Sequence, residues 1–366
     1  MIVSEANNIH TALKHNKRVT KIKLEDEGSL LLRHSLAELK EPFPMLEYLD
    51  TRDRTNFFYA RPPVVLSESF LGGSAPSLVH LRFGGLLFFG LPKLLLSANN
   101  LVDICLWEDS PYISPEGMAA SLCTMKHLQS LDITFQFDSY GYSHRAGQRP
   151  HPITRIVLPA LSRLSLKCTE DYVEDLVARL DTPSLELMEI SRLSSFESDF
   201  SELLQFISRI KALEISDQAQ LFTHNTKFQL TIPKKDRAEL SLIFMSPSKI
   251  VWSAFPPLHF ERLEIHEDRL MMLSLKMDAE SELRELSHRS TAVKNLFLDP
   301  NAAVHVADAL TTFAEESMTG LFPALQYMYF HEFPLLPPIQ EAFLRFTAAR
   351  QVTRHPVTLR KWEWGK

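Results

Sequence analysis

Cysteine is scarce in this chain: its 366 residues include three, Cys105, Cys123 and Cys168, and no two of them form a CxxC pair. So small and odd a number excludes a disulfide framework, and the spacing is not that of a zinc site. The sequence also lacks the basic and apolar regions of a secretory signal and any N-x-Ser/Thr glycosylation site. We therefore expect a reducing compartment, cytoplasmic or nuclear.

Long apolar runs and an excess of positive charge are missing as well. The most apolar stretch, residues 83–96, is interrupted by Pro92 and Lys93. It is shorter than the roughly 20 residues that a transmembrane helix needs. Lys and Arg total 39 against 45 Asp and Glu, a formal net charge of -6. This balance gives no general attraction to phosphate backbones or anionic lipids, so we expect neither nucleic acid nor a membrane as partner.

Catalytic and cofactor motifs are the third absence. The sequence contains no G-x-G-x-x-G, G-x-x-x-x-G-K-[ST], G-x-S-x-G or H-E-x-x-H. Its most glycine-rich segment, residues 70–76, lacks the lysine of a phosphate loop, and a tight turn before a strand accounts for it better. His144 and His151 share one segment, but a scattered pair is a weak metal candidate. We predict a protein that is not an enzyme and needs no cofactor or metal.

A short apolar phrase, L-x-x-L-x-L, recurs along the chain. Subtraction of the first residue numbers of its clearest copies gives spacings from 23 (101 minus 78) to 33 (161 minus 128). A repeat of roughly 20–29 residues with this phrase is typical of leucine-rich-repeat proteins, and we estimate about eleven to thirteen units. The copies begin at Val19, Leu46, Leu78, Leu101, Leu128, Leu161, Leu185, Ile210, Phe260, Val293 and Leu325.

Between the phrases the apolar period changes to that of a helix. Ser114 and Pro115 predict a helix start, and Asp171 with Glu174 resembles a capping box. We therefore predict an α/β leucine-rich-repeat solenoid, a horseshoe or arc of irregular repeats with parallel strands on its concave face and helices on its convex face. It forms a single domain over 1–366. Residues 228–232 and 240–244 read as strands of a degenerate repeat or of a local hairpin, and 136–152 as an exposed loop.

The residues between the apolar positions of each strand are expected to face the concave side. There they form a mixed-charge surface with aromatic anchors for a protein ligand, although charged side chains pointing to water are what any half-exposed strand needs. The predicted protein-binding face consists of Arg82, Trp107, Asp132, Arg163, Glu189, Glu214, Arg262, Glu264, Phe297 and Tyr329.

Several segments together resemble the F-box proteins of mushroom-forming (basidiomycete) fungi, whose carboxy-terminal part is an irregular leucine-rich-repeat array. The matching segments, in chain order, are FLGGSAPSLVHLRF at 70–83, GLPKLLLSANNLVDICLWEDSPYISPEGM at 90–118, LPALSRLSLKCTEDYVEDLVARLDTPSLE at 158–186, AVKNLFLD at 292–299, LFPALQYMYF at 321–330 and FTAARQVTRHPV at 346–357.

The resemblance implies the substrate-recognition part of an SCF ubiquitin ligase, acting in ubiquitin-dependent protein degradation. In this family an F-box precedes the repeats and holds the Skp adaptor. No F-box pattern is recognisable in this sequence, so we expect Skp and cullin as partners only if an F-box is encoded upstream. The alternative is a stand-alone repeat scaffold or adaptor without a ligase role.

Overall fold

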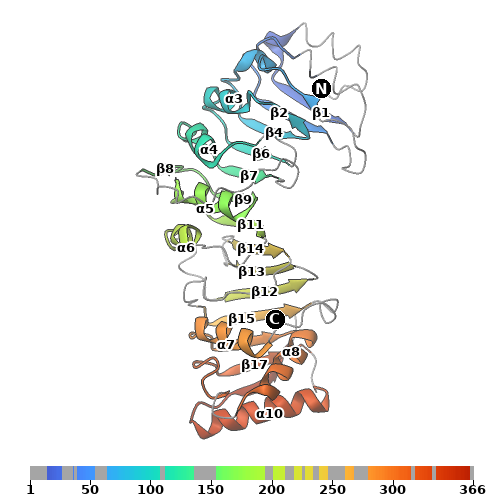
Figure 1. The fold of residues 1–366 in the computed structure, drawn as a ribbon, viewed down its shortest axis with the longest axis vertical. Helices are drawn as coiled ribbons and strands as arrows, with labels where there is room; N and C mark the ends of the chain where they lie inside the picture. The colour runs from blue at the N-terminus through green and yellow to red at the C-terminus, as the bar shows by residue number, and fades with distance from the viewer. Residues whose placement is uncertain are drawn as a thin grey trace. The chain divides into compact units, whose positions relative to one another are not determined.

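The computed structural model divides the chain into two compact units (Figure 1). Unit 1 comprises residues 1–188 and 205–211, and unit 2 comprises 189–204 and 212–366. Glu214, His144, His151 and the predicted loop 136–152 lie outside the residues that the structure describes. The described residues are 15–26, 36, 39–53, 64–107, 112–135, 154–193, 201–210, 218–224, 227–233, 239–245, 260–267, 279–314, 318–331 and 335–362.

Six strands of unit 1 pair side by side, and every pair is parallel. Their order in the sheet is their order in the chain, as expected when each strand is followed by a crossover. β11 (Leu187–Leu193) begins beside the last of them, where Leu187 N donates to the Ser162 carbonyl. The six are β1 (Lys21–Asp26), β2 (Tyr48–Asp53), β4 (His80–Gly84), β6 (Asp103–Leu106), β7 (Ser130–Thr134) and β9 (Arg163–Lys167).

The apolar phrase sets both the start of each strand and its register. In β4 the first apolar residue, Leu78, lies two residues before the strand, where its N–H closes a turn on the Ala75 carbonyl. The second and third, Leu81 and Phe83, lie within the strand and are 0% exposed. Each such side chain contributes about 1.5–3 kcal/mol by leaving water. The second positions align across the strands as Leu49, Leu81, Ile104, Leu131 and Leu164.

Helices cover one side of this sheet, as α3 (Leu91–Ser97), α4 (Pro115–Leu122) and α5 (Glu170–Ala178) show in Figure 1. A fourth helix, α6 (Ser201–Ser208), follows β11 in the chain. The predicted start of α4 is confirmed, since the Ser114 side chain accepts a hydrogen bond from Gly117 N at 3.1 Å. The predicted start of α5 at Asp171 is wrong. That helix begins at Glu170 after Thr169, because Asp171 already lies in its first turn.

The glycine-rich segment forms a turn, as predicted from its lack of a lysine. It contains the short 3-10 helix η2 (Phe70–Gly73), in which Leu71, Gly72 and Gly73 all have left-handed backbones. A Cβ on Gly72 would lie 2.9 Å from Pro42 Cα, so only glycine fits there without a shift. The turn therefore fixes the approach to β4. The remaining small elements of unit 1 are η1 (Asn16–Arg18) and the strand pairs β3 (Val64–Val65) with β5 (Leu86–Leu87) and β8 (Ile156–Val157) with β10 (Leu180–Asp181).

Unit 2 combines two kinds of strand pairing. β12 (Gln218–His224), β13 (Lys227–Pro233) and β14 (Glu239–Met245) pair antiparallel, which confirms the hairpin alternative for 228–232 and 240–244. β12 then pairs parallel with the next strand of the apolar phrase, and the parallel ladder continues to the last strand. These strands are β15 (Arg262–Glu267), β16 (Asn295–Leu298), β17 (Tyr327–Phe330) and β18 (Thr358–Lys361).

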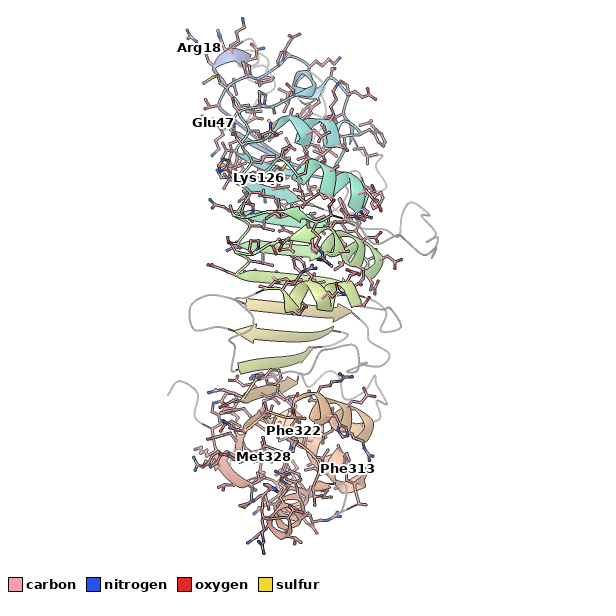
Figure 2. The ribbon with its side chains drawn as sticks, turned by 90° about the vertical axis from the view of Figure 1, so that its left-hand side faces the viewer. Arg18, Glu47, Lys126, Phe313, Phe322 and Met328 are labelled. Atoms are coloured by element: carbon pink, nitrogen blue, oxygen red, sulfur yellow. The ribbon has the colours of Figure 1, made fainter. Side chains whose placement is uncertain are left out.

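Three helices, α7 (Ala279–Arg289), α8 (Pro300–Thr312) and α10 (Pro337–Val352), complete unit 2. The inward side chains of the strands pack against them: Phe330 of β17 lies edge-on to Phe343 of α10, with ring centroids 4.8 Å apart. Phe313, Phe322 and Met328, labelled in Figure 2, are all buried in this unit. Unit 2 thus encloses an apolar core of its own.

An arginine also lies inside unit 2. Arg350 of α10 is 1% exposed, and its guanidinium donates to the backbone carbonyls of Thr319, Phe322, Pro323 and Leu325 at 2.8–3.4 Å. Burial lowers the pKa of Arg350 below its ordinary value. The four carbonyls belong to the turn before β17, so this side chain holds the turn to α10.

Candidate binding face

Each parallel ladder presents a face that is turned away from the helices. Along β4 the residues alternate, with Leu81 and Phe83 buried against the helices and His80 and Arg82 half-exposed on the other side. We name this side open face 1 on β1, β2, β4, β6, β7 and β9 of unit 1, and open face 2 on β15 to β18 of unit 2. The predicted site residues that the structure describes lie on or beside β4 to β11 and β15 to β17.

Open face 1 is built from charged pairs that connect neighbouring strands. Arg82 Nε of β4 lies 3.3 Å from Asp103 Oδ2 of β6, and His80 Nδ1 lies 3.9 Å from the same oxygen. Burial alone would lower the pKa of Arg82, but the Asp103 carboxylate outweighs it, and the pKa lies above its ordinary value. The Arg82 side chain is still 40% exposed, so the pair adds at most about 1 kcal/mol to stability.

A buried carboxylate, Asp50, lies on β2 beside these pairs. It is 2% exposed and accepts hydrogen bonds from Arg52 Nε at 3.0 Å and from the Tyr48 hydroxyl at 3.2 Å. A carboxylate is stable at this depth only because both donors replace its water. Burial and then the Asp50 charge raise the pKa of Tyr48, so the phenol stays a donor. Asp50 pairs with Arg82 in the strand register.

Trp107, a predicted aromatic anchor, is held by an arginine and a glycine. The Arg52 guanidinium lies over its ring, with Cζ 3.8 Å from the centroid, which is the geometry of a cation–π contact. A Cβ on Gly84 would lie 2.7 Å from Trp107 Cβ. Because Gly84, the last residue of β4, has no side chain, the Trp107 side chain has room to pack against the end of that strand.

Asp132 and Cys105 form the next contact on open face 1. The Cys105 thiol lies 3.7 Å from Asp132 Oδ2, while Asp132 Oδ1 is buried and has no hydrogen-bond partner among the described residues. Burial first, and then the charges of Asp132 and Asp103, raise the pKa of Cys105 far above its ordinary value. The thiol is thus a weak donor and not a nucleophile. Arg163 of β9 is exposed; Glu189 of β11, which belongs to unit 2 and to neither open face, is half-buried.

Open face 2 starts with a buried glutamate. Glu264 is 5% exposed, which corrects the expectation that it points to water. Arg262 donates to Glu264 Oε1 from Nε at 2.8 Å and from its terminal nitrogen at 2.7 Å, and His266 Nε2 lies 3.4 Å from Oε2. Both flanking side chains are positioned two residues away on β15, where side chains share one face of the strand. The glutamate is buried because these partners compensate it.

Aromatic rings follow on the next strands. Phe297 of β16 and Tyr329 of β17 stack in parallel, with centroids 4.3 Å apart and an interplanar angle of 4°. Arg262 Cζ lies 4.0 Å from the Phe297 centroid, and the Trp362 ring meets Phe297 edge-on at 5.1 Å. Phe297 is therefore only 6% exposed, contrary to the expectation of an exposed anchor, whereas Tyr329 is half-buried.

The last strand adds a second arginine. Arg360 Cζ of β18 lies 3.9 Å from the Tyr327 centroid, and the Tyr327 and Tyr329 centroids are 6.2 Å apart. Tyr329 and Arg360 are direct partners in the strand register. Open face 2 is thus a strip of rings between two guanidinium groups, Arg262 and Arg360.

Several residues of these faces were not among the predicted ones: Asp50, Arg52, Tyr327, Arg360 and Trp362. The strand register could have identified two of them, because Asp50 is the register partner of the predicted Arg82, and Arg360 is the register partner of the predicted Tyr329. The arginine–aromatic contacts carry no sequence signal of their own, since they join residues that are far apart in the chain.

Two further properties bear on the chemistry of the described residues. Among them, no group of three or more His, Cys, Asp or Glu side chains is placed to hold a metal ion. Within the same part of the chain, no helix combines the length and the apolar character needed to cross a membrane. The contacts described on the two faces are ion pairs, buried carboxylates and stacked rings.

No protein-family model matches the sequence, and no curated protein matches it. Among solved structures, the chain is similar to the leucine-rich repeat-containing protein LegL7 from Legionella pneumophila. The two are 11% identical, with a TM-score of 0.28 over 95% of this chain and 96% of that chain. A likeness at this level does not establish a shared fold.

Proposed function

We propose that the chain is a non-enzymatic, protein-binding leucine-rich-repeat domain whose parallel strands lie on the concave face of an arc and whose helices lie on its convex face. The strand register supports this architecture, because the apolar phrase aligns from strand to strand in each unit and its copies are 23 (101 minus 78) to 33 (161 minus 128) residues apart. Binding then takes place on the open faces.

The observation that carries the binding function is the clamped ring pair of open face 2. The Phe297 ring stacks on the Tyr329 ring and also contacts the Arg262 guanidinium. Tyrosine, tryptophan and arginine are the residues that most often dominate the binding energy of protein interfaces. Because these side chains are already held by one another, a partner that covers them has little further side-chain entropy to lose.

The more specific role that we propose is substrate recognition in an SCF-type ubiquitin ligase. It is supported by the resemblance of six ordered segments to the fungal F-box family. In that role the chain captures a protein substrate, and the Skp adaptor and cullin are its partners only if an F-box is encoded upstream. The corresponding compartment is the cytoplasm or the nucleus, which agrees with three cysteines and no glycosylation site.

The binding function is tested by capture of proteins from an extract of the source cell. The wild-type chain is compared with Tyr329→Ala on open face 2 and with Arg345→Ala, an exposed position of α10. Tyr329→Ala should lose at least one captured protein that wild type and Arg345→Ala retain in equal amounts. Thermal unfolding of all three chains checks that the loss is not due to unfolding. Equal capture by all three chains would remove open face 2 from the proposal.

The ligase role needs a separate measurement. The chain is expressed with the Skp adaptor, once alone and once with the coding sequence that lies upstream of Met1. Co-purification that depends on the upstream segment supports the receptor role. If neither form retains the adaptor while proteins are still captured, the chain is a stand-alone scaffold or adaptor instead.

A further inference from the structure

We propose that open face 2 binds an extended, acidic peptide segment of the partner protein, with a carboxylate on Arg360 and a neighbouring aromatic side chain on Tyr329. This inference rests on the proposed protein-binding function and specifies the chemistry of the ligand. Some hydrogen-bond donors of open face 2 already have a partner within the face, whereas others do not.

The two arginines that bound open face 2 differ in what their donors do. Arg262 directs two nitrogens at Glu264 Oε1, so its charge is neutralised within the face. Arg360 is exposed, and its printed contact is the Tyr327 ring beneath it. Among the described residues no carboxylate pairs with Arg360. A ring below a guanidinium covers its flat face but leaves the N–H groups at its edge free, which is the geometry that binds a carboxylate with two parallel hydrogen bonds.

The rings beside Arg360 supply more donors and an apolar surface. Tyr327 and Tyr329 are both half-buried, and neither hydroxyl has a hydrogen-bond partner within the described residues. A phenol is an amphipathic group that packs its ring on an apolar side chain and donates its O–H to an acceptor. The patch formed by Tyr327, Tyr329 and Arg360 therefore favours a ligand with acceptors and an aromatic ring.

The charges of open face 2 favour an anionic ligand. Its carboxylates are already engaged, because Glu264 is paired with Arg262 and His266, and Asp299 Oδ1 accepts from Ala302 N at the start of α8. By contrast, Arg360 is an exposed cation without an acidic partner in the part of the chain that the structure describes. An incoming carboxylate thus meets uncompensated positive charge next to the rings.

The spacing of the patch matches an extended chain. Tyr329 and Arg360 are partners on neighbouring strands, whose backbones lie about 4.8 Å apart. In an extended peptide, residues i and i+2 point to one side and are about 6.8 Å apart, so an acidic residue and an aromatic residue in these positions reach Arg360 and Tyr329 together. Single-stranded nucleic acid also stacks on rings, but it needs a basic groove along its backbone. With a net charge of -6 and one exposed arginine at the patch rather than a basic groove, the chain favours the peptide.

The test uses three fluorescein-labelled peptides, Gly-Glu-Tyr-Glu-Tyr-Gly and its versions with Gln or Lys in place of Glu, together with a labelled ten-residue oligo-dT. Fluorescence anisotropy measures their binding to the full chain, to Arg360→Glu and to Arg345→Glu. Arg345 is the matched control, since it is an exposed arginine of the same unit on α10. We expect the Glu peptide to bind most tightly and to lose about tenfold or more in affinity with Arg360→Glu, but less than about twofold with Arg345→Glu. Arg360→Lys should lose an intermediate amount.

The other outcomes contradict the inference in different ways. Equal binding of the Glu and Gln peptides would show that the face does not recognise a carboxylate. Equal effects of the Arg360 and Arg345 variants would show that the peptide does not bind at Arg360. Tighter binding of oligo-dT makes the face a nucleic-acid site. If no peptide binds while Tyr329→Ala still abolishes protein capture, the acidic-peptide inference is wrong and the proposed function stands. If capture is also unaffected by Tyr329→Ala, both fail.

Discussion

Open face 1 and open face 2 are each built on a parallel ladder, but from different side chains. On open face 1, Arg82 pairs with Asp103 and Asp50 is enclosed by Tyr48 and Arg52. On open face 2, rings take the central places and the arginines lie over them. The backbone register is set by the inward apolar positions, so the outward positions are free to differ. The comparison shows that the apolar positions determine where an open face lies, whereas the intervening residues determine its chemistry.

The largest expected effect tests whether the apolar ladder supports both units equally. Leu164→Ala in unit 1 and Leu296→Ala in unit 2 remove side chains that are 0% and 1% exposed. Each should lower the free energy of unfolding by about 2–5 kcal/mol, because a cavity is left in a packed core. Urea unfolding of the two variants measures this. A large loss for one and none for the other would mean that the ladder is not the common support.

Arg350 provides a contrast, since it belongs to unit 2 alone. Arg350→Met leaves the carbonyls of residues 319–325 without their donor, and we expect a loss of about 2–4 kcal/mol. Arg345→Met on the exposed side of α10 is the control and should change stability by less than about 0.5 kcal/mol. Both are measured by urea unfolding. Equal stability of the two variants would contradict the structural role of Arg350.

The turn of η2 is a corresponding feature of unit 1. Gly72→Ala combines a left-handed backbone with a contact of 2.9 Å to Pro42 Cα, and it should cost about 1–3 kcal/mol. Gly73→Ala is the matched control, because its φ is also positive but its nearest neighbour, Glu68 O, is 3.6 Å away. Thermal unfolding should therefore show the smaller loss for Gly73→Ala, and the difference between the two variants measures the clash.

The carboxylates of the two faces should respond differently to removal. Asp132→Ala on open face 1 deletes a side chain with one unpartnered oxygen, and we expect a change within about 0.5 kcal/mol. Glu264→Ala on open face 2 leaves Arg262 and His266 without their acceptor and should cost about 1–3 kcal/mol. If chemical unfolding shows a larger loss of stability for Asp132→Ala than for Glu264→Ala, the stronger carboxylate contacts assigned to open face 2 are contradicted.

The smallest effect concerns the thiols, all three of which lie in unit 1. Cys123 is exposed, while burial raises the pKa of Cys168 from 9.0 to about 12. At pH 9 iodoacetamide should therefore label Cys123 and spare Cys105 and Cys168, as read by mass spectrometry. The unfolded chain loses the Cys168 proton near pH 9, so the stability that this thiol contributes is full below pH 9 and falls between pH 9 and 12. Rapid labelling of all three thiols would show that unit 1 opens readily.

The apolar phrase predicted more of the fold than of the faces. Each described strand that carries a copy of the phrase begins two residues after its first apolar residue, as β4 does after Leu78 and β17 after Leu325. That regularity follows from local turn geometry and burial, which the sequence contains. The reversal of β12 to β14 and the donors of Arg350 depend on which distant segments meet. No periodicity encodes such meetings, so these features needed the structure.

On the open faces, period-two alternation predicts the side of the strand that a residue takes, but not how deeply the residue is buried. Period-two alternation places Glu264 and Phe297 on the outward side. It does not show that Arg262 and His266 of the same strand pair with Glu264, or that the Tyr329 ring of the next strand stacks on Phe297. Once the strand pairing is known, the residues that lie side by side on neighbouring strands can be identified. One such row consists of Glu264, Phe297, Tyr329 and Arg360.

The antiparallel strands of unit 2 also affect the order of folding. β12 and β13 pair residues that are close in the chain, such as Thr223 with Phe228, whereas each parallel pair of unit 1 must close a segment of more than twenty residues, as from Leu81 to Ile104. Short hairpins form in about 1–10 μs, and longer loops carry a larger entropy of closure. Although unit 1 leaves the ribosome first, we expect β12 and β13 to form sooner after their own synthesis than any parallel pair. A kinetic nucleus near the middle of the chain is thus a consequence of one reversal in an otherwise parallel array.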